Sequence, residues 1–314
     1  MPTVNYSRST SQSSSTQMHE IFRLRDCMLL IGLLLDWSSL VNFSVLDLDL
    51  VQSVFRDRLR RIFGVFFSPW QRDKIFETLR KTDALISGPI AWAATVPELE
   101  YELLPREMQV VTPPETFNSW AETLIQAGYC IVGDAGFIGY ESRINQVYRF
   151  KTVDETMSVT VIESRKASTL DVIVNLPLTS DMIIVDGSRM YSLYPELLRQ
   201  GITVSSQHKP SSEHIEWWKK RRIAYHESTV GWNHSCGTAC PAVWRYTEEL
   251  DGIEEFNWGG WHNGKVDGRS VATYSVLRTQ RIKWRLGVHC SNAYCPFRGG
   301  YYYDRISDTR LDCD

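Results

Sequence analysis

The sequence lacks the short motifs by which common catalytic sites are recognised. It contains no Gly-x-Ser-x-Gly nucleophile elbow, no glycine-rich phosphate loop ending in Lys-Ser or Lys-Thr, and no histidine pair at the spacing of a metalloprotease helix. The histidines at positions 208, 214, 226 and 262 are scattered, as surface or hydrogen-bonded side chains usually are. These absences favour a non-catalytic protein over a hydrolase, a phosphate-loop enzyme or a zinc protease.

The sequence also lacks a long apolar run and an excess of charge of one sign. Its first apolar run, residues 27–35, covers about nine residues, whereas a membrane-spanning helix needs about 20. Lys plus Arg number 34 against 37 for Asp plus Glu, which gives a net charge of −3. The composition therefore predicts no membrane partner, and it gives the whole molecule no attraction to nucleic acid.

Seven cysteines are few for a chain of 314 residues, and they are unevenly spread. Cys27, Cys130 and Cys313 stand alone, while the other four form two close pairs. This distribution does not fit a small disulfide scaffold. It favours a reducing, intracellular compartment, either the cytoplasm or the nucleus. Residues 1–20 are rich in Ser, Thr and Gln, and this composition predicts a flexible tail.

Residues 70–228 alternate between helical and strand-like patterns. We expect helices at 71–81 and 117–127, with a further helical stretch that begins at Ile90. Runs rich in β-branched and aromatic residues predict strands at 108–112, 128–132, 146–151, 157–162, 171–174 and 182–185. Residues 190–198 indicate a helix start with buried tyrosines. The alternation predicts an α+β fold in which helices cover one face of a central mixed or antiparallel sheet.

Residues 21–63 form a helical segment in front of this domain. Leucines recur at helical spacing between Leu29 and Leu34, and residues 36–39 supply a break with a cap for the next helix. A third helix places four basic residues away from its apolar side: Arg56, Arg58, Arg60 and Arg61. We expect these arginines to form a solvated face.

A known module is similar to this helical segment. Residues 31–46, IGLLLDWSSLVNFSVL, followed by residues 55–59, FRDRL, resemble the F-box. The match covers roughly 40 residues and lacks the usual Leu-Pro opening, in whose place residues 24–26 read Leu-Arg-Asp. The resemblance implies docking on the adaptor subunit of cullin-based ubiquitin ligases. The candidate partner-binding side chains are Leu33, Leu35, Leu40 and Phe43. The alternative is a plain helical hairpin packed on the following domain.

A second resemblance begins after residue 83. Residues 84–88, together with residues 105–111 (PREMQVV), resemble the opening of the nucleotidyltransferase fold. The chain also resembles a group of uncharacterised fungal proteins that join an F-box-like start to such a domain. The resemblance implies a nucleotide site whose matching positions are Ser87, Gly88, Glu107 and Gln109.

This nucleotide site departs from the family pattern at the residues that carry chemistry. Active members hold magnesium with two carboxylates one residue apart on a strand, which places both on one face. Here the second position is Gln109, a neutral amide, and Pro89 follows the glycine, where a backbone N–H would be wanted for phosphate. Glu163 is the nearest third acid, and Glu98 with Glu100 offers an alternative pair. We therefore expect a vestigial site without magnesium.

The most specific pattern is formed by the paired cysteines. Three residues separate Cys236 from Cys240, four residues separate Cys290 from Cys295, and each pair is followed by proline. Two short cysteine turns brought together supply the four soft ligands of a structural zinc ion and leave no open position for a catalytic water. Buried cysteines without metal, or disulfides, also explain the pairs, and His234 or His289 could replace one ligand.

A basic aromatic run, WWKKRR at residues 217–222, allows two interpretations. It could bind phosphates with stacking support, or it could be a solvated helix face anchored by its tryptophans. The latter is favoured, so nucleic acid is the least favoured partner.

The predicted organisation is a tail at 1–20, an F-box-like segment at 21–63, a nucleotidyltransferase-like α+β domain at 70–228 and a loop-rich Cys/Trp module at 229–314. The leading hypothesis is a non-catalytic adaptor that also recognises a protein target. The alternatives are a divergent nucleotidyltransferase or nucleotide-binding protein, and a nucleic-acid-contacting protein that uses residues 219–222 and the cysteine module.

Overall fold

The structure of the chain is a computed structural model, and it describes residues 13–97, 103–134, 142–206, 208–250, 252–259, 275–287 and 289–298. Glu98, Glu100 and most of the predicted flexible tail lie outside these residues. Residues 13–20, which were also assigned to the tail, belong to a helix.

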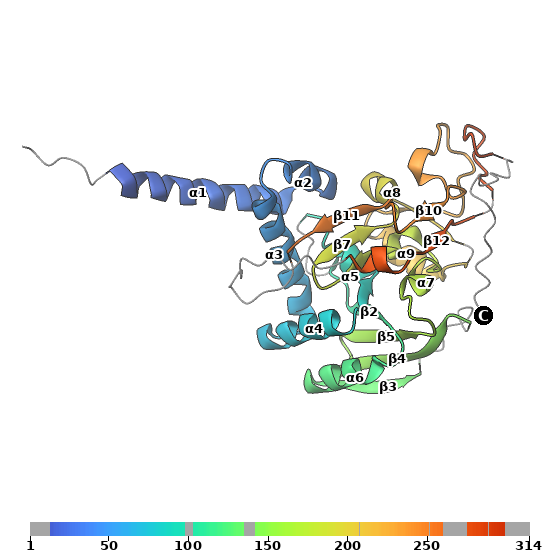
Figure 1. Cartoon of the computed structure of the whole chain (residues 1–314), viewed down its shortest axis with the longest axis horizontal. Helices are drawn as coiled ribbons and strands as arrows, with labels where there is room; N and C mark the ends of the chain where they lie inside the picture. Colours follow the sequence, from blue (N-terminus) through green and yellow to red (C-terminus); the bar gives the residue numbers. More distant parts are fainter. Residues whose placement is uncertain are drawn as a thin grey trace, which may run out of the picture.

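A mixed eight-stranded sheet forms the centre of the molecule, in the order β11-β7-β6-β1-β2-β5-β4-β3 (Figure 1). Its strands are β1 (Leu85–Ser87), β2 (Glu107–Thr112), β3 (Tyr129–Asp134), β4 (Ile144–Thr152), β5 (Ser158–Ser164), β6 (Ile183–Val185), β7 (Arg189–Ser192) and β11 (Glu254–Asn257). Strands β2 and β5 are parallel, and the other neighbours in the sheet are antiparallel. The predicted α+β class with a mixed sheet is confirmed.

Helices precede, follow and interrupt the sheet. They are α1 (Ser13–Leu34), α2 (Trp37–Phe43), α3 (Leu48–Phe66), α4 (Pro69–Lys81), α5 (Pro89–Ala93), α6 (Phe117–Gln126), α7 (Leu170–Ile173), α8 (Pro195–Gln200), α9 (Ser212–Lys219) and α10 (Val276–Thr279), with 3-10 turns η2 (Thr179–Asp181) and η3 (Gly237–Ala239). Two small sheets lie beside them. The parallel pair is β8 (Ile202–Val204) with β9 (Ala224–His226), and the antiparallel pair is β10 (Arg245–Tyr246) with β12 (Lys283–Trp284).

Local sequence explains where several helices begin. The Asp36 carboxylate accepts a hydrogen bond from the Ser39 N–H at 2.7 Å, and Asp47 caps α3 in the same way through Leu50. These caps satisfy N–H groups that have no partner inside the helix. Helix α4 begins with a capping box between residues 68 and 71 and has a proline in its first turn. The predicted break and cap at residues 36–39 are therefore confirmed.

Apolar side chains pack on both faces of the sheet. Met108 and Val110 point to the face covered by α3, α4, α5 and α6. Leu85 and Val111 point to the opposite face, where they pack with residues of α7, α8 and the cysteine region. The prediction that helices cover one face only is wrong, because alternate residues of the central strands are apolar on either side.

Two local predictions need correction. Residues 171–174 were expected to form a strand, but residues 170–173 are the short helix α7, in which two β-branched residues and a leucine are buried. Residues 190–198 begin as strand β7, and the helix starts only at Pro195. The expected burial of Tyr191 and Tyr194 is confirmed. Short apolar runs fit a strand and a buried helix turn equally well, so their periodicity alone did not separate the two.

The chain after the boundary expected at residue 229 contributes a strand to the central sheet. Strand β11 pairs with β7 at the edge of the central sheet (Figure 1). Trp258, the residue that follows β11 in the chain, is buried. Its ring centroid lies 6.2 Å from that of Phe55 and 5.8 Å from that of Phe76. Phe256 and Trp258 therefore belong to the core that joins the N-terminal helices to the sheet.

The N-terminal helices pack on the body through α3, and α1 extends away from it (Figure 1). Arg58 was predicted to face solvent, but it is 1% exposed. Its guanidinium donates hydrogen bonds to the backbone carbonyls of Gly32, Leu33 and Leu35 at the end of α1. The last carbonyls of a helix lack N–H partners from a following turn, and here the Gly32 carbonyl also accepts from the Leu35 N–H at 3.3 Å. The buried arginine supplies further donors to this helix end. No helix in the described part of the chain is long and apolar enough to cross a membrane.

Candidate metal centre

The four paired cysteines meet in one cluster. Cys236 and Cys240 flank the 3-10 turn η3, and Cys290 lies 54 residues beyond Cys236 in a loop that also carries Cys295. All four side chains are buried among residues of α7, α8 and the neighbouring strands. The sequence pattern is thus brought together as predicted, by two turns that lie far apart in the chain.

The distances between the sulfur atoms fit a metal site. All four Sγ atoms lie within 4.8 Å of one another. The Sγ atoms of Cys236 and Cys290 are 3.5 Å apart, and those of Cys240 and Cys295 are also 3.5 Å apart. Four thiolates around zinc, with Zn–S bonds of about 2.3 Å, have Sγ–Sγ edges of about 3.8 Å. Within the described residues no other group of three or more metal-binding side chains comes this close, and the cluster is compatible with a structural metal such as zinc.

Hydrogen-bond donors surround the sulfur atoms. The Asn292 amide donates to Cys236 Sγ at 3.0 Å and to the His234 carbonyl at 2.7 Å, and Asn292 is fully buried. Burial raises the pKa of the Cys236 thiol to about 12. Burial also raises the pKa of the Cys290 thiol, but hydrogen bonds from Thr229 and from the Asn292 backbone outweigh this effect. The pKa of Cys290 is therefore lowered. Donors of this kind stabilise a thiolate, which is the form that binds metal.

A buried arginine holds the loop that carries the first cysteine pair. Arg245 donates hydrogen bonds to the carbonyls of Thr238 and Val243, and its guanidinium stacks 4.0 Å from the ring centre of Tyr194. Trp284, on the partner strand, donates its ring N–H to the Tyr194 hydroxyl at 3.2 Å. The inner face of the β10–β12 pair therefore fixes the η3 turn on which Cys236 and Cys240 stand.

The alternatives raised by the sequence fare differently. A disulfide requires sulfur atoms about 2.05 Å apart. The two close pairs are 3.5 Å apart, and all four cysteines are free thiols. His234 is exposed, and its Nδ1 lies 2.9 Å from the Ser235 carbonyl oxygen, while His289 is exposed as well. Neither histidine belongs to the ligand group.

The residues of the vestigial nucleotide site lie on adjacent strands. Ser87 of β1 stands opposite Gln109 of β2, and Glu107 is two residues earlier on the same face. Glu107 accepts a hydrogen bond from Thr160 at 3.2 Å. The Gly88 N–H, which the resemblance would direct at phosphate, donates instead to backbone carbonyls of residues 181 and 183. These residues are thus brought together, but the glycine N–H already has partners within the fold.

The third acid considered from sequence does not join this group. Glu163 of β5 stands beside Thr112 of β2 in the parallel pairing. Thr112 is an odd number of residues from Glu107 and Gln109 along β2, so its side chain points to the opposite face from theirs. Alternate residues point to opposite faces, so Glu163 lies on the other side of the sheet. It is buried there and accepts hydrogen bonds from Asn145 and Gln146 at 2.7 and 2.8 Å.

A buried acid that the sequence did not single out lies nearer to the glycine turn. Asp181 is buried, and its Oδ1 is 3.1 Å from Nε2 of His214, which also lies 3.1 Å from the Trp218 ring nitrogen. Burial acts to lower the pKa of His214, but the Asp181 carboxylate outweighs it and raises the pKa. A protonated His214 donates to Asp181, and a neutral ring can accept from Trp218. Nothing in the spacing of Asp181 and His214 along the chain indicates that their side chains are in contact.

The residues predicted to bind a partner are mostly covered. Leu40 is 1% exposed and belongs to the core beneath α2, so its assignment to an open face is wrong. Leu33, Leu35 and Phe43 are half-buried and pack against the same core. The physical reason is that α2 and the end of α1 turn these side chains towards α3 to shield its apolar residues. The large exposed aliphatic side chains of the segment are at other positions: Leu24, Leu30, Ile31, Leu34, Val45, Leu46 and Leu48.

The basic aromatic run is held in place by its own stacking. Trp218 is buried, and the Arg221 guanidinium lies 3.4 Å from the ring centre of Trp217. Arg221 also donates two hydrogen bonds to the Leu103 carbonyl, at 3.0 and 2.7 Å. Lys219 and Lys220 are exposed, as expected for a solvated face, but Arg221 is half-buried.

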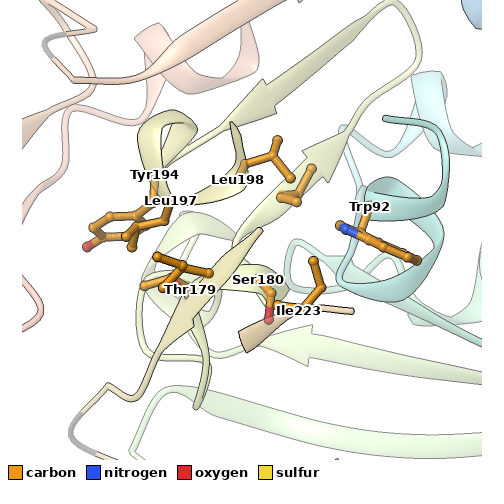
Figure 2. A pocket seen from close by; sticks show the side chains of 9 residues that line it. Trp92, Thr179, Ser180, Tyr194, Leu197, Leu198 and Ile223 are labelled. Atoms are coloured by element: carbon orange, nitrogen blue, oxygen red, sulfur yellow. The ribbon is translucent and has the colours of Figure 1, made fainter. Parts of the chain in front are cut away.

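A small hollow lies beside α5 and α8 (Figure 2). Its lining is mostly apolar and includes Trp92, Leu197 and Ile223, with Thr179 and Ser180 as the polar members. It encloses about 250 Å³ of empty space, open solvent included. Sites for drug-sized ligands occupy roughly 300–1,000 Å³, so this hollow is a packing feature rather than a ligand site.

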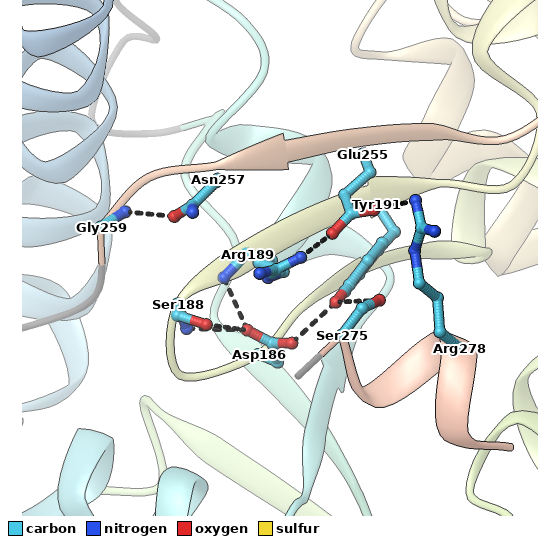
Figure 3. A network of polar contacts seen from close by, with 9 residues as sticks. All are labelled: Asp186, Ser188, Arg189, Tyr191, Glu255, Asn257, Gly259, Ser275 and Arg278. Carbon is cyan, nitrogen blue, oxygen red and sulfur yellow. Dashed lines mark hydrogen bonds and ion pairs between the residues drawn. The ribbon is translucent and has the colours of Figure 1, made fainter. Parts of the chain in front are cut away.

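A polar network connects the β6–β7 hairpin to the region near α10 (Figure 3). Asp186 accepts hydrogen bonds from the N–H groups of Ser188 and Arg189 at 2.7 and 2.6 Å, and from the Tyr191 hydroxyl at 3.0 Å. The Tyr191 hydroxyl also lies 3.1 Å from Ser275 Oγ. Burial raises the pKa of Asp186. Each group has a partner within the fold, so the network fixes the hairpin against the C-terminal region.

Comparison with known proteins adds no family assignment. A scan against protein-family models found no match to the chain, and a search of the curated proteins also found none. The function has to be argued from the residues themselves.

Proposed function

We propose that the chain is a non-catalytic binding protein that presents its N-terminal helices to a protein partner and is held together by a structural zinc ion. The partner implied by the F-box resemblance is the adaptor subunit of a cullin-based ubiquitin ligase. The observation that carries this proposal is the group of exposed aliphatic side chains on α1 and the α2–α3 turn, which we call the aliphatic ridge: Leu24, Leu30, Ile31, Leu34, Val45, Leu46 and Leu48.

The ridge differs from the scattered apolar residues of an ordinary surface. Val45 and Leu46 are 87% and 79% exposed, and Leu24, Ile31 and Leu34 recur along α1 at spacings of seven and three. Such spacing places side chains on one face of a helix. Single exposed leucines are common, but several gathered on one helical segment mark a docking surface, and helix faces of this kind bind in apolar grooves.

The cysteine cluster supports a structural rather than a catalytic role for zinc. Cys236, Cys240, Cys290 and Cys295 supply four thiolates, so the metal would have no open position for a substrate or an activated water. The region around them is poor in regular structure, and its two-stranded sheet has only two residues in each strand. A metal that crosslinks two distant turns stabilises such a segment where few backbone hydrogen bonds do.

The alternative of nucleotidyl transfer has weaker support. Gln109 is a neutral amide, and Glu163 faces away from Glu107. A divalent ion that bridges a triphosphate needs carboxylates to balance its charge. Glu107 is exposed and is contacted by Arg149 at 3.8 Å, which offsets part of its charge.

The test is a binding measurement with purified cullin adaptor subunit and the full chain. We expect wild type to bind and the double variant Leu34→Asp/Leu46→Asp to bind at least about tenfold more weakly, because burying two charges in an apolar groove opposes docking. The matched control is Ile125→Asp/Val153→Asp, which changes two exposed aliphatic residues elsewhere on the surface. Leu40 is left intact, because a charge at this buried position would disrupt the fold.

Equal binding by both double variants would contradict docking through the ridge. No binding by wild type would reject the ligase adaptor as the partner. Either result would leave residues 24–48 as a helical extension without this function.

A further inference from the structure

A buried carboxylate and a tryptophan share one nitrogen atom of His214. Asp181, on η2, is 3% exposed, and its Oδ1 lies 3.1 Å from Nε2 of His214 on α9. The ring nitrogen of Trp218, four residues later on α9, lies 3.1 Å from the same Nε2. The carboxylate accepts a hydrogen, whereas the indole N–H donates one. The two contacts therefore require opposite states of Nε2, and only one of them is a hydrogen bond at a time.

The protonation of His214 decides between these two contacts. In the protonated ring both nitrogens carry hydrogen, so Nε2 donates to Asp181. In the neutral ring with its hydrogen on Nδ1, Nε2 accepts from Trp218 and the carboxylate loses its donor. The other neutral form keeps the hydrogen bond to Asp181 but lacks the positive charge opposite it. Asp181 Oδ2 has no hydrogen-bond partner among the described residues, so loss of the proton leaves a buried carboxylate poorly compensated.

The charged groups around His214 come from several elements. Asp181 is the charged group in direct contact with it, and the Glu107 carboxylate of β2 also favours the protonated ring. Glu107 is itself contacted by Arg149 of β4 at 3.8 Å, and both of these side chains are exposed, so solvent screens their effect. On α9, the acidic residue of the first turn, Glu213, is exposed as well. The buried Asp181 therefore dominates the electrostatic surroundings of His214.

We propose that His214 and Asp181 form a proton-dependent latch that holds α9 against η2, closed when His214 is protonated and open when it is neutral. The latch involves neither the aliphatic ridge nor the cysteine cluster, so it does not rest on the proposed function. Helix α9 also packs through Trp218, whose ring centroid lies 5.3 Å from that of Trp92. Opening of the latch therefore loosens α9 without unfolding the body.

The hollow beside α5 and α8 borders this latch (Figure 2). Ser180, which lines the hollow, precedes Asp181 in the chain. Ile223 lines it from the other side, and its N–H donates to the Trp218 carbonyl at 3.2 Å. Movement of α9 is thus coupled to Ile223, and we expect the open latch to widen the hollow.

The direction of the pH dependence follows from the pKa of His214. Burial acts to lower this pKa, but the Asp181 carboxylate outweighs burial and raises the pKa above its ordinary value of 6.5. A proton that is bound more tightly in the closed state stabilises that state. The stabilisation is fully present below about pH 6.5 and is lost as the pH rises through the raised pKa. The latch therefore opens on the alkaline side of neutrality.

The test is hydrogen exchange of the full chain by mass spectrometry at about pH 6 and about pH 8.5, with rates corrected for the intrinsic pH dependence of amide exchange. In wild type, protection of residues 212–219 relative to 117–126 of α6 should fall about tenfold, because one unit of pKa difference changes the opening equilibrium by this factor. His214→Gln does not titrate and should show equal relative protection at both pH values. The matched control, His226→Gln, replaces the half-buried histidine of β9 and should keep the wild-type response.

An NMR titration of the histidine ring protons assigns the effect to the contact with Asp181. We expect Asp181→Asn to lower the titration midpoint of His214 by about one unit or more, the usual effect of removing an opposite charge at this distance. An unchanged midpoint in Asp181→Asn, or a wild-type response in His214→Gln, would overturn the proposal. So would wild-type protection of α9 that does not change with pH, and this measurement needs no variant to fold.

Discussion

At the scale of single residues, the four clustered cysteines carry the clearest testable chemistry. Their Sγ atoms lie within 4.8 Å of one another, while Cys130 is an exposed cysteine on β3 with no part in the cluster. If the cluster holds zinc, each thiolate is one of four ligands, and removing one lowers the affinity for the metal and the stability that the metal confers.

We therefore predict that Cys236→Ser loses its zinc and unfolds at a free energy lower by about 4 kcal/mol or more, a loss in the range that follows removal of a structural metal. Metal analysis of purified protein and urea denaturation measure the two effects. Cys130→Ser is the matched control and should keep both metal content and stability. Full zinc content in Cys236→Ser would rule out this site.

The cysteine cluster was predicted from the sequence, but the residues that surround it were not. Pairs of cysteines are visible in the sequence because metal sites require few residue types at short spacing. Asn292, which donates to Cys236 Sγ, and Arg245, which fixes the η3 turn, carry no such signal. Their roles depend on which turns meet in space, and one sequence does not encode that in a local pattern. The same reason explains why Asp181 and His214 were not connected.

At the scale of helices and strands, the docking of α1 depends on one buried arginine. The Arg58 guanidinium donates to carbonyls at the end of α1 and, at 3.5 Å, to the Ala94 carbonyl after α5. Burial lowers the pKa of Arg58 to about 10, so the side chain stays charged at neutral pH. The contact also needs close approach of the helices, because a Cβ on Gly32 would lie 2.6 Å from Val54 Cγ2.

We predict that Arg58→Met lowers the free energy of unfolding by about 2–4 kcal/mol, since buried carbonyls that lose their donors cost about 1–3 kcal/mol each. Urea denaturation followed by tryptophan fluorescence measures the loss. The matched control is Arg60→Met on the same helix, where the side chain is exposed and pairs with Asp57 at the surface. This control should stay within about 0.5 kcal/mol of wild type. Similar values for the two variants would show that Arg58 does not hold α1.

Regular elements with their own local patterns were the ones that sequence analysis found. Helix α4 has a capping box and a proline at its start, and β2 ends in three β-branched residues, Val110, Val111 and Thr112. Strand β11, with the sequence EEFN, has one buried residue, Phe256, and looks like a loop when read alone. It is a strand because β7 offers it an edge, so its structure depends on long-range pairing rather than on propensity.

At the scale of the whole molecule, Phe256 and Trp258, in the region after residue 229, belong to the same core as the N-terminal helices. Trp258 is fully buried beside Phe55 of α3 and Phe76 of α4. Gln52 of α3 donates to the Asn257 carbonyl at 2.9 Å, and Trp37 donates to Glu254 at 2.7 Å. The helices that carry the aliphatic ridge and strand β11 thus pack in one body.

We predict that Trp258→Ala reduces hydrogen-exchange protection in α3 (Leu48–Phe66) as well as in β11, because removal of a buried tryptophan typically costs about 3–5 kcal/mol and leaves a cavity against Phe55 and Phe76. Exchange measured by mass spectrometry resolves the two segments, which lie about 200 residues apart in the chain. Trp70→Ala is the control, since Trp70 is 59% exposed on α4 and its loss opens no cavity. If the added exchange in Trp258→Ala stayed within residues 254–259, the C-terminal region would be a separate unit, as the domain boundary expected at residue 229 predicts.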